Sequence, residues 1–351
     1  MKKVNLGLIL LGLAFLGYLV WHAGPGNLWG QVGGLGWGLG LLIAAEGAAN
    51  LAHTAGWRHC IGESHGRVCL TRLFRISAAG YAVNYLTPTA SVGGEVTRGA
   101  LLASTHGRHE AASSVLLDKL MTAIGHLVLV VLGLLLLSWR VSLPIELWVA
   151  MVATTVLLSG GVGGFLLLQK HGKTGALCRW LVRHGLGGRP MERATQHISE
   201  VDQTLKRFYR DHPRDLALSV AWHLLGHSVA ILHAWLFLCL LGQSASLTTV
   251  VAAGFLSLWF DLLTFAIPLN LGTLEGSRIL VFSALGCQAL LGAAFGLALR
   301  IAQVFWAFYG LVSYALLTDV ATPVAVAWPF KWAAAWKDKV RVLLLRQRRR
   351  I

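Results

Sequence analysis

Charged residues are scarce in this 351-residue sequence. Asp, Glu, Lys and Arg make up only 13% of it, whereas a soluble domain carries about a quarter. Acidic residues are the scarcer kind, at 15, and hydrophobic residues make up 56%. This is too little charge for a surface that faces water. The composition therefore excludes soluble enzymes, secreted disulfide scaffolds and DNA-binding domains as descriptions of the whole chain.

Cysteine and cofactor motifs are also few. The five cysteines are odd in number, and the topology derived below puts none in an outer loop, so no disulfide framework is expected. Cys60 and Cys69 lie near His59 and His65, but their spacing matches no zinc pattern. The sequence has no phosphate-binding loop G-x4-G-K-[ST], which argues against ATP as an energy source. We expect no metal and no other cofactor.

Long apolar runs take the place of charge. A bilayer core requires about 20 consecutive apolar residues in each crossing helix, and several runs are long enough. The sequence therefore predicts an all-α, polytopic membrane protein. About six helices are expected to cross, at roughly 4–22, 36–57, 112–138, 145–168, 216–241 and 288–317.

Basic residues are distributed unevenly between the two sides of this predicted topology. Most of the 30 Lys and Arg residues fall in a few segments that would share one side, and only Arg140 lies in a loop that must face the other side. The segments are 2–3, 58–75, 108, 170–214 and 331–350. The positive-inside rule makes them cytoplasmic, with both termini inside. The net charge of +15 then indicates contact with anionic lipid headgroups, and no nucleic acid is expected.

Two stretches, 76–104 and 248–285, must return to the side from which they start. Glycine and proline interrupt them, and the first is too short for two full crossings. We interpret both as re-entrant helical hairpins. The chain then divides into five parts. Residues 1–140 form a first half with its hairpin, and 141–168 form the first helix of a second half. Residues 169–214 are a basic loop, 215–318 are the rest of the second half with its hairpin, and 319–351 are a basic tail.

A short repeat supports two halves of opposite orientation. Pro88 is followed after seven residues by Glu95 and three later by Arg98, and Pro268 is followed in the same way by Glu275 and Arg278. Inverted repeats with broken helices at corresponding positions are typical of transporters that bind substrate near the membrane midplane. The basic loop carries a separate signal, because its apolar residues share one helical face: Ile198, Val201, Leu205 and Phe208. This helix is expected either to lie on the membrane surface or to pack on the helix ends.

The charges inside the membrane are the candidate functional residues, because each is costly there and needs an explanation. The principal candidates are the two repeated pairs, Glu95 with Arg98 and Glu275 with Arg278. Their hairpin arms begin with residues suited to capping or to close backbone approach, so both N-termini are expected to attract an anion such as a phosphate headgroup. The capping candidates are Thr89, Ser91, Asn270 and Thr273. The alternative is that each Glu–Arg pair merely holds its hairpin together.

Further intramembrane charges support this candidate site. Lys119 follows Glu95 by 24 residues and Arg300 follows Glu275 by 25, so each half places a base in the helix after its hairpin. The other charges in this group are Glu46, Asp118 and Asp261. Two polar faces accompany them, with Glu46, Asn50 and His53 on one predicted helix and His223, His227 and His233 on another. These faces favour polar packing between helices, and a proton relay is the second interpretation.

Three segments resemble the lysylphosphatidylglycerol synthase transmembrane-domain family, which is also described as flippase-like and includes hopanoid-associated proteins. They are NYLTPTASVGGEVTRGALL (Asn84–Leu102), SSVLLDKL (Ser113–Leu120) and IPLNLGTLEGSR (Ile267–Arg278). In the two-domain synthases a similar membrane domain is fused to a soluble domain that charges lipid with an amino acid, and the membrane part moves that lipid. The resemblance therefore implies lipid translocation, without aminoacyl transfer in this chain. It also implies that the two Glu–Arg pairs are functional, with Asn84, Asp118 and Lys119 in support.

The leading hypothesis is a non-enzymatic transporter that moves an anionic or polyisoprenoid-type lipid across the inner membrane through the two hairpins. One alternative is a membrane-embedded lipid-modifying enzyme with Glu95 or Glu275 as its acid or base. Such an enzyme requires a nucleophile or metal beside the carboxylate, and no such motif is found. Another alternative is a non-catalytic partner of lipid or glycan biosynthesis enzymes.

Overall fold

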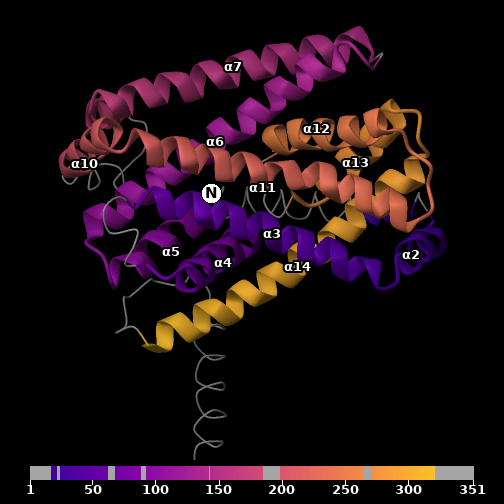
Figure 1. Ribbon diagram of the computed structural model, residues 1–351, viewed down its shortest axis with the longest axis horizontal. Helices are drawn as coiled ribbons and strands as arrows, with labels where there is room; N and C mark the ends of the chain where they lie inside the picture. Colours follow the sequence, from indigo (N-terminus) through magenta and orange to yellow (C-terminus); the bar gives the residue numbers. More distant parts are fainter. Residues whose placement is uncertain are drawn as a thin grey trace, which may run out of the picture.

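The computed structural model describes residues 17–21, 24–61, 68–87, 92–141, 143–184, 198–264, 267 and 270–320. Every long regular element in these residues is a helix, and the longest run side by side or cross at shallow angles (Figure 1). The all-α, polytopic prediction is confirmed. The helices are α2 (Pro25–Gly34), α3 (Gly38–His59), α4 (Leu70–Leu86), α5 (Val92–Ala103), α6 (Arg108–Leu137), α7 (Ile145–Lys170), α8 (Thr174–Arg183), α10 (Ile198–Asp211), α11 (Pro213–Leu240), α12 (Leu247–Thr264), α13 (Thr273–Ala284) and α14 (Ala289–Val320).

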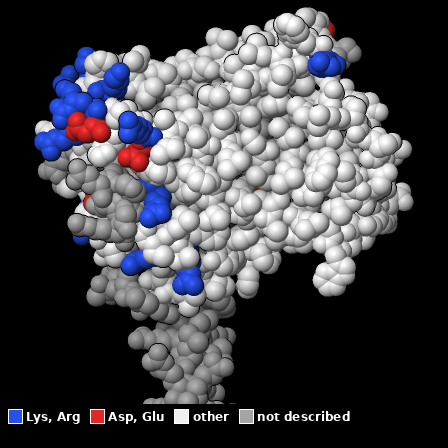
Figure 2. All heavy atoms as spheres, in the orientation of Figure 1, with Lys and Arg blue, Asp and Glu red and all other residues white. Residues whose placement is uncertain are grey.

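Five described helices are long and apolar enough to cross a membrane: α6, α7, α11, α12 and α14. A sixth crossing results if α2 and α3, which meet at 77°, form one broken span. Figure 2 shows that the Lys and Arg side chains on the visible face gather at the end where α10 lies, while the broad middle of the face carries almost none. An uncharged belt with charged ends is what a bilayer requires. The chain is therefore a multi-pass integral membrane protein.

The expected crossing helices correspond closely to observed ones. Those expected at 36–57, 112–138, 145–168, 216–241 and 288–317 are α3, α6, α7, α11 and α14. Of the helix expected at 4–22, only residues 17–21 are described, and they are helical. The predicted tail, 319–351, lies outside the described residues except at its start. Helix α2 was not expected; it is a short helix that begins with Pro25, whose fixed φ suits a first helical turn.

Each stretch interpreted as a hairpin contains two helices. The first holds α4 and α5, of 17 and 12 residues, and both are shorter than a bilayer crossing. Because α4 begins at Leu70, Arg72 and Arg75 lie on this helix and not in the loop where the sequence placed them. The second stretch has unequal arms, since α12 has 18 residues and α13 has 12. The re-entrant placement of both hairpins and their inverted symmetry stay predictions.

Helix α14 joins the two hairpins by packing against α4 and α13 (Figure 1). Glycines permit this approach. A Cβ added at Gly296 would lie 2.8 Å from the Cα of Glu275, and one added at Gly310 would collide with the carbonyl oxygen of Ala78. The helix backbones therefore approach more closely than any larger residue allows.

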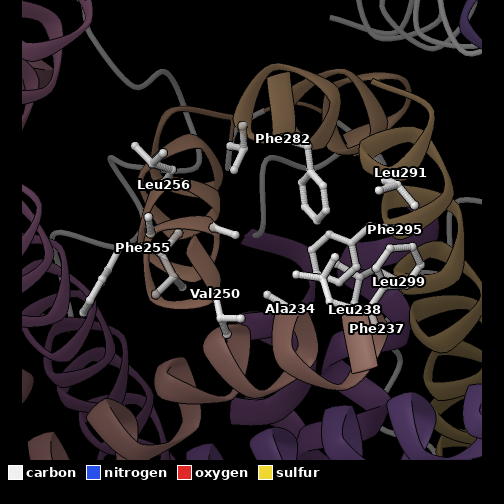
Figure 3. Close-up of a cluster of buried hydrophobic side chains, with 14 of the residues drawn as sticks. Ala234, Phe237, Leu238, Val250, Phe255, Leu256, Phe282, Leu291, Phe295 and Leu299 are labelled. Carbon is white, nitrogen blue, oxygen red and sulfur yellow. The ribbon is translucent and has the colours of Figure 1, made fainter. Parts of the chain in front are cut away.

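Two apolar clusters fill the interior. In one, Phe237, Phe282 and Phe295 point toward one another from α11, α13 and α14, with ring centroids 5.1–6.3 Å apart (Figure 3). The other cluster lies where α10 meets the ends of the long helices, and it includes Leu205 and Phe208 of α10. The predicted apolar face of the basic loop therefore packs on the helix ends, although the side chains of its other two residues, Ile198 and Val201, lie outside the described ones.

Candidate functional site

The first hairpin holds a network of four charges. The Arg98 guanidinium donates from Nη1 to Glu95 Oε2 at 3.0 Å and from Nη2 to Asp118 Oδ2 at 2.6 Å. Lys119 Nζ lies 3.3 Å from Glu95 Oε1, and the guanidinium stacks 3.9 Å from the ring centroid of Trp57. The expected Glu95–Arg98 pair is therefore present, as i,i+3 spacing on one helix allows. Two acids and two bases neutralise one another, from buried Asp118 to half-exposed Lys119.

The N-terminus of α5 is already satisfied in part from within the protein. Gly94 N–H donates to Asn84 Oδ1 at 2.6 Å, and a Cβ at Gly94 would collide with Asn84 and with the Gly80 carbonyl. Asn84 on α4 therefore takes one of the amide groups that the sequence assigned to an anion. The two expected caps of this arm, Thr89 and Ser91, lie outside the described residues.

The second hairpin pairs its charges differently from the prediction. Arg278 forms a bidentate pair with Asp261 of α12, at 3.0 Å and 2.8 Å, and Glu275 forms another with Arg300 of α14, at 2.8 Å and 2.9 Å. The expected Glu275–Arg278 pair is wrong. Helix α13 lies between α12 and α14, and each neighbour offers an opposite charge in the planar two-bond geometry that a guanidinium favours.

Arg300, the base expected in the helix after this hairpin, is buried within α14. The expected caps of α13 are corrected. Asn270 and Thr273 do not cap α13 with their side chains, because the capping position is Gly272, at φ 72°, and it makes no side-chain cap bond. The Asn270 carbonyl instead accepts from Arg300 Nη2 at 2.7 Å.

A cavity of about 320 Å³ lies among α3, α4, α11, α12, α13 and α14. Its charged lining residues are Arg278, Asp261 and Glu46. Both polar faces noted in the sequence contribute to the lining, through Asn50 and His53 on one and His227 and His233 on the other. The remaining polar residues of the lining are Tyr81, Ser257 and Gln303. The spacing of Glu46, Asn50 and His53 thus does place them on one face. Arg278 Nε and Ser257 Oγ are buried and have no hydrogen-bond partner in the described part of the chain.

The cavity includes some of the candidate residues and excludes others. Of the four principal candidates, Arg278 lines it, whereas Glu95, Arg98 and Glu275 do not. Glu46 and Asp261, which the sequence gave only a supporting role, line it as well. The two hairpins therefore do not present their Glu–Arg pairs to one shared space. The first network approaches the cavity through other side chains.

Those side chains belong to a cluster of four histidines on α3, α6 and α11, of which His53 lines the cavity and His223 contacts Asp118. His53 Nδ1 lies 2.9 Å from His223 Nδ1, and His223 Nε2 lies 3.1 Å from Asp118 Oδ1. The His227 ring centroid is 4.7 Å from that of His53 and 4.5 Å from that of His126. His126 was not among the expected site residues, although it follows Asp118 by eight residues on the same helix. Within the described residues, no group of three or more His, Cys, Asp or Glu side chains is arranged to hold a metal ion.

These features define a class of protein: a multi-pass helical membrane protein with paired charges among its helices and a cavity lined by both polar and apolar side chains. The sequence model of the lysylphosphatidylglycerol synthase TM region matches residues 5–312, and the chain belongs to this family. The match confirms the resemblance found in the sequence. No curated protein and no solved structure matches the chain.

Proposed function

We propose that this protein is a flippase-like lipid transporter of a bacterial inner membrane, and that it binds the anionic headgroup of its lipid in the cavity. One observation carries the proposal. Arg278 is 3% exposed, lines a cavity that several other polar side chains also line, and has an Nε–H without an acceptor in the described residues. A polar headgroup that crosses a bilayer requires a site of this kind, because unpaired charge in hydrocarbon is costly.

The chemistry of the lining indicates a phosphate. The two terminal nitrogens of Arg278 bind Asp261, so an anion would gain the unpartnered Nε–H and the hydroxyl of Ser257 once these buried groups turn toward it. Arginine binds phosphate oxygens through two parallel bonds. A fully bound phosphate would therefore have to compete with Asp261 for the guanidinium. Because of this competition, the headgroup would bind Arg278 weakly and leave again, as transport requires.

A phosphate occurs in both candidate lipid classes, the anionic phospholipids and the polyisoprenoid phosphates. The group proposed to bind in the cavity is the phosphate that both classes share, and a panel of lipids distinguishes the two classes. A zwitterionic phospholipid serves as the comparison, because its headgroup carries a cation that would meet Arg278.

The test is transbilayer movement of fluorescent lipids in proteoliposomes, for phosphatidylglycerol, a polyprenyl phosphate and phosphatidylcholine. Native protein is expected to move at least one anionic lipid faster than protein-free vesicles. Arg278→Gln should lose that movement, while the matched control Arg140→Gln should keep it, since Arg140 is exposed in the turn after α6. Circular dichroism and size-exclusion chromatography establish that each variant is folded.

Two outcomes would refute the proposal. Native protein that moves no lipid in the panel is not a transporter of these classes, and mass spectrometry of the same lipids would then test the enzyme alternative. Equal movement by the native protein and Arg278→Gln would show that the cavity is not the headgroup site.

A further inference from the structure

The histidine cluster connects two polar regions that lie on different parts of the fold. His53 lines the cavity, and Asp118 belongs to the charge network of the first hairpin. Between them lies His223, buried on α11, within hydrogen-bond distance of both. The contacts form one unbroken line from the cavity to Asp118, with no gap longer than 3.1 Å between adjacent polar atoms.

The hydrogen-bond partners determine which nitrogen atoms along this line carry a hydrogen. Asp118 is paired with Arg98, so its carboxylate only accepts, and His223 Nε2 must carry a hydrogen to donate to Asp118 Oδ1. A neutral His223 then accepts at Nδ1, so the hydrogen in the 2.9 Å contact belongs to His53 Nδ1. The remaining nitrogen of neutral His53, Nε2, consequently carries a lone pair.

We infer that His53 and His223 form a proton relay between the cavity and Asp118. A proton from the cavity binds His53 Nε2, and the hydrogen on His53 Nδ1 passes to His223 Nδ1. The hydrogen on His223 Nε2 then passes to Asp118 Oδ1. One proton enters, one reaches the carboxyl group, and both imidazoles end neutral in their other tautomers. The reverse transfer returns the proton to the cavity and restores the starting state, so net proton movement across the membrane requires the cavity to open to the other side between the two transfers.

Protonation of Asp118 has a structural consequence. The carboxylate holds Arg98 of α5 against α6 through its 2.6 Å contact, and a neutral carboxyl group attracts a guanidinium far less. The relay therefore links events in the cavity to the strength of the contact that joins the first hairpin to α6. This inference rests on the proposed function, because it supplies the coupling ion for the movement of lipid.

The other two histidines flank the relay without extending it. His227 Nε2 donates to the Thr122 carbonyl and His126 Nε2 donates to the Leu258 carbonyl, so neither offers a second polar contact along the line. Charged and titratable groups also surround His53 from several helices and from the cavity: His223 and His227 on α11, Asp118 and His126 on α6, Arg98 on α5, Glu46 on its own helix, Asp261 on α12 and Arg278 on α13.

The experiment places the native protein in liposomes containing fluorescent phosphatidylglycerol, with a pH difference of one unit and the membrane potential held at zero. If one proton accompanies each lipid, the lipid should accumulate about tenfold in one leaflet, because a pH unit corresponds to a tenfold change in an equilibrium ratio. An entrapped pH dye should report proton movement in the same vesicles.

Variants then separate the relay from transport itself. His223→Gln and His53→Gln keep an amide for hydrogen bonding but cannot pass a proton from one ring nitrogen to the other. In His223→Gln, lipid should still move but should distribute evenly, and the proton signal should fall to that of protein-free vesicles. His126→Gln is the matched control, since it removes a ring that contacts the cluster from outside the relay, and it should accumulate lipid like the native protein.

The outcomes distinguish the two proposals. Native protein that moves lipid without accumulating it would overturn the relay and leave the proposed function standing. Accumulation that persists in both relay variants would do the same. Native protein that moves neither lipid nor protons would overturn both proposals, and proton movement lost in His223→Gln but kept in His126→Gln would support the relay independently of lipid.

Discussion

Replacing Arg300 by leucine would leave the Glu275 carboxylate in a site that is 3% exposed, without its bidentate cation. Removing one partner of a buried ion pair costs about 3–5 kcal/mol of unfolding free energy, because the remaining charge is uncompensated. Glu275→Leu should lower the unfolding free energy by less, about 3 kcal/mol. In that variant Arg300 still donates to the carbonyl of Asn270 and lies within 3.4 Å of the Tyr85 hydroxyl.

The double variant Glu275→Leu/Arg300→Leu tests whether Glu275 and Arg300 form a pair. It contains no unpaired charge, and its main remaining defect is the Asn270 carbonyl that Arg300 satisfied, worth about 1–3 kcal/mol. It should therefore be more stable than Arg300→Leu alone. In the comparison cycle, Glu275→Leu/Arg278→Leu, the interaction energy should be smaller than between Glu275 and Arg300, because Glu275 and Arg278 form no ion pair in the structure and each has another partner.

The assay is equilibrium unfolding in mixed micelles of a mild and a denaturing detergent, followed by circular dichroism and tryptophan fluorescence. Both cycles use the same detergent series, so the interaction energies compare directly. A larger interaction energy between Glu275 and Arg278 than between Glu275 and Arg300 would refute the observed pairing. A loss of less than about 1 kcal/mol in Arg300→Leu would refute the claim that the pair is buried.

Two further predictions concern packing and a surface thiol. Gly310→Ala should destabilise the protein by about 1–3 kcal/mol, because its methyl group would meet the Ala78 carbonyl. Gly160→Ala, with no atom within 4 Å of the added carbon, should be neutral or stabilising by about 0.5–1 kcal/mol; equal effects in the unfolding assay would contradict the packing of α14 on α4. Hydrogen bonds from the Thr71 side chain and backbone lower the pKa of the exposed Cys69 thiol. More thiolate is then present at neutral pH, so iodoacetamide should react with Cys69 faster than in Thr71→Val, and the difference should vanish at pH values above the ordinary thiol pKa. Equal rates at neutral pH would show that the hydrogen bond does not form.

The candidate site shows where reasoning from spacing succeeds. Glu46, Asn50 and His53 were expected on one helix face, and all three line the cavity. Glu95 and Arg98 were expected to pair, and they do. Both expectations concern residues within one helix, where the 3.6-residue period fixes which side chains are neighbours.

Reasoning from spacing failed where partners come from other helices. The repeat suggested that Glu275 and Arg278 pair as Glu95 and Arg98 do, but α12 and α14 supply the partners instead. The same limit hid the contact between His53 and His223, which are 170 residues apart. Each of these contacts depends on how three helices rotate about their axes, and no local pattern in the sequence encodes that rotation.

The sequence by itself determined that the chain is a multi-pass helical membrane protein and where its long helices lie, because a bilayer demands apolar runs of a set length. It also determined which charges lie within the long helices or beside them, since few charges fall there, although Lys119 among them is half-exposed. Only the tertiary structure decided which charges pair, which of them reach the cavity and which histidines connect it to the first hairpin. The physical reason is that helix formation is local, whereas a cavity and a relay exist only where several helices meet.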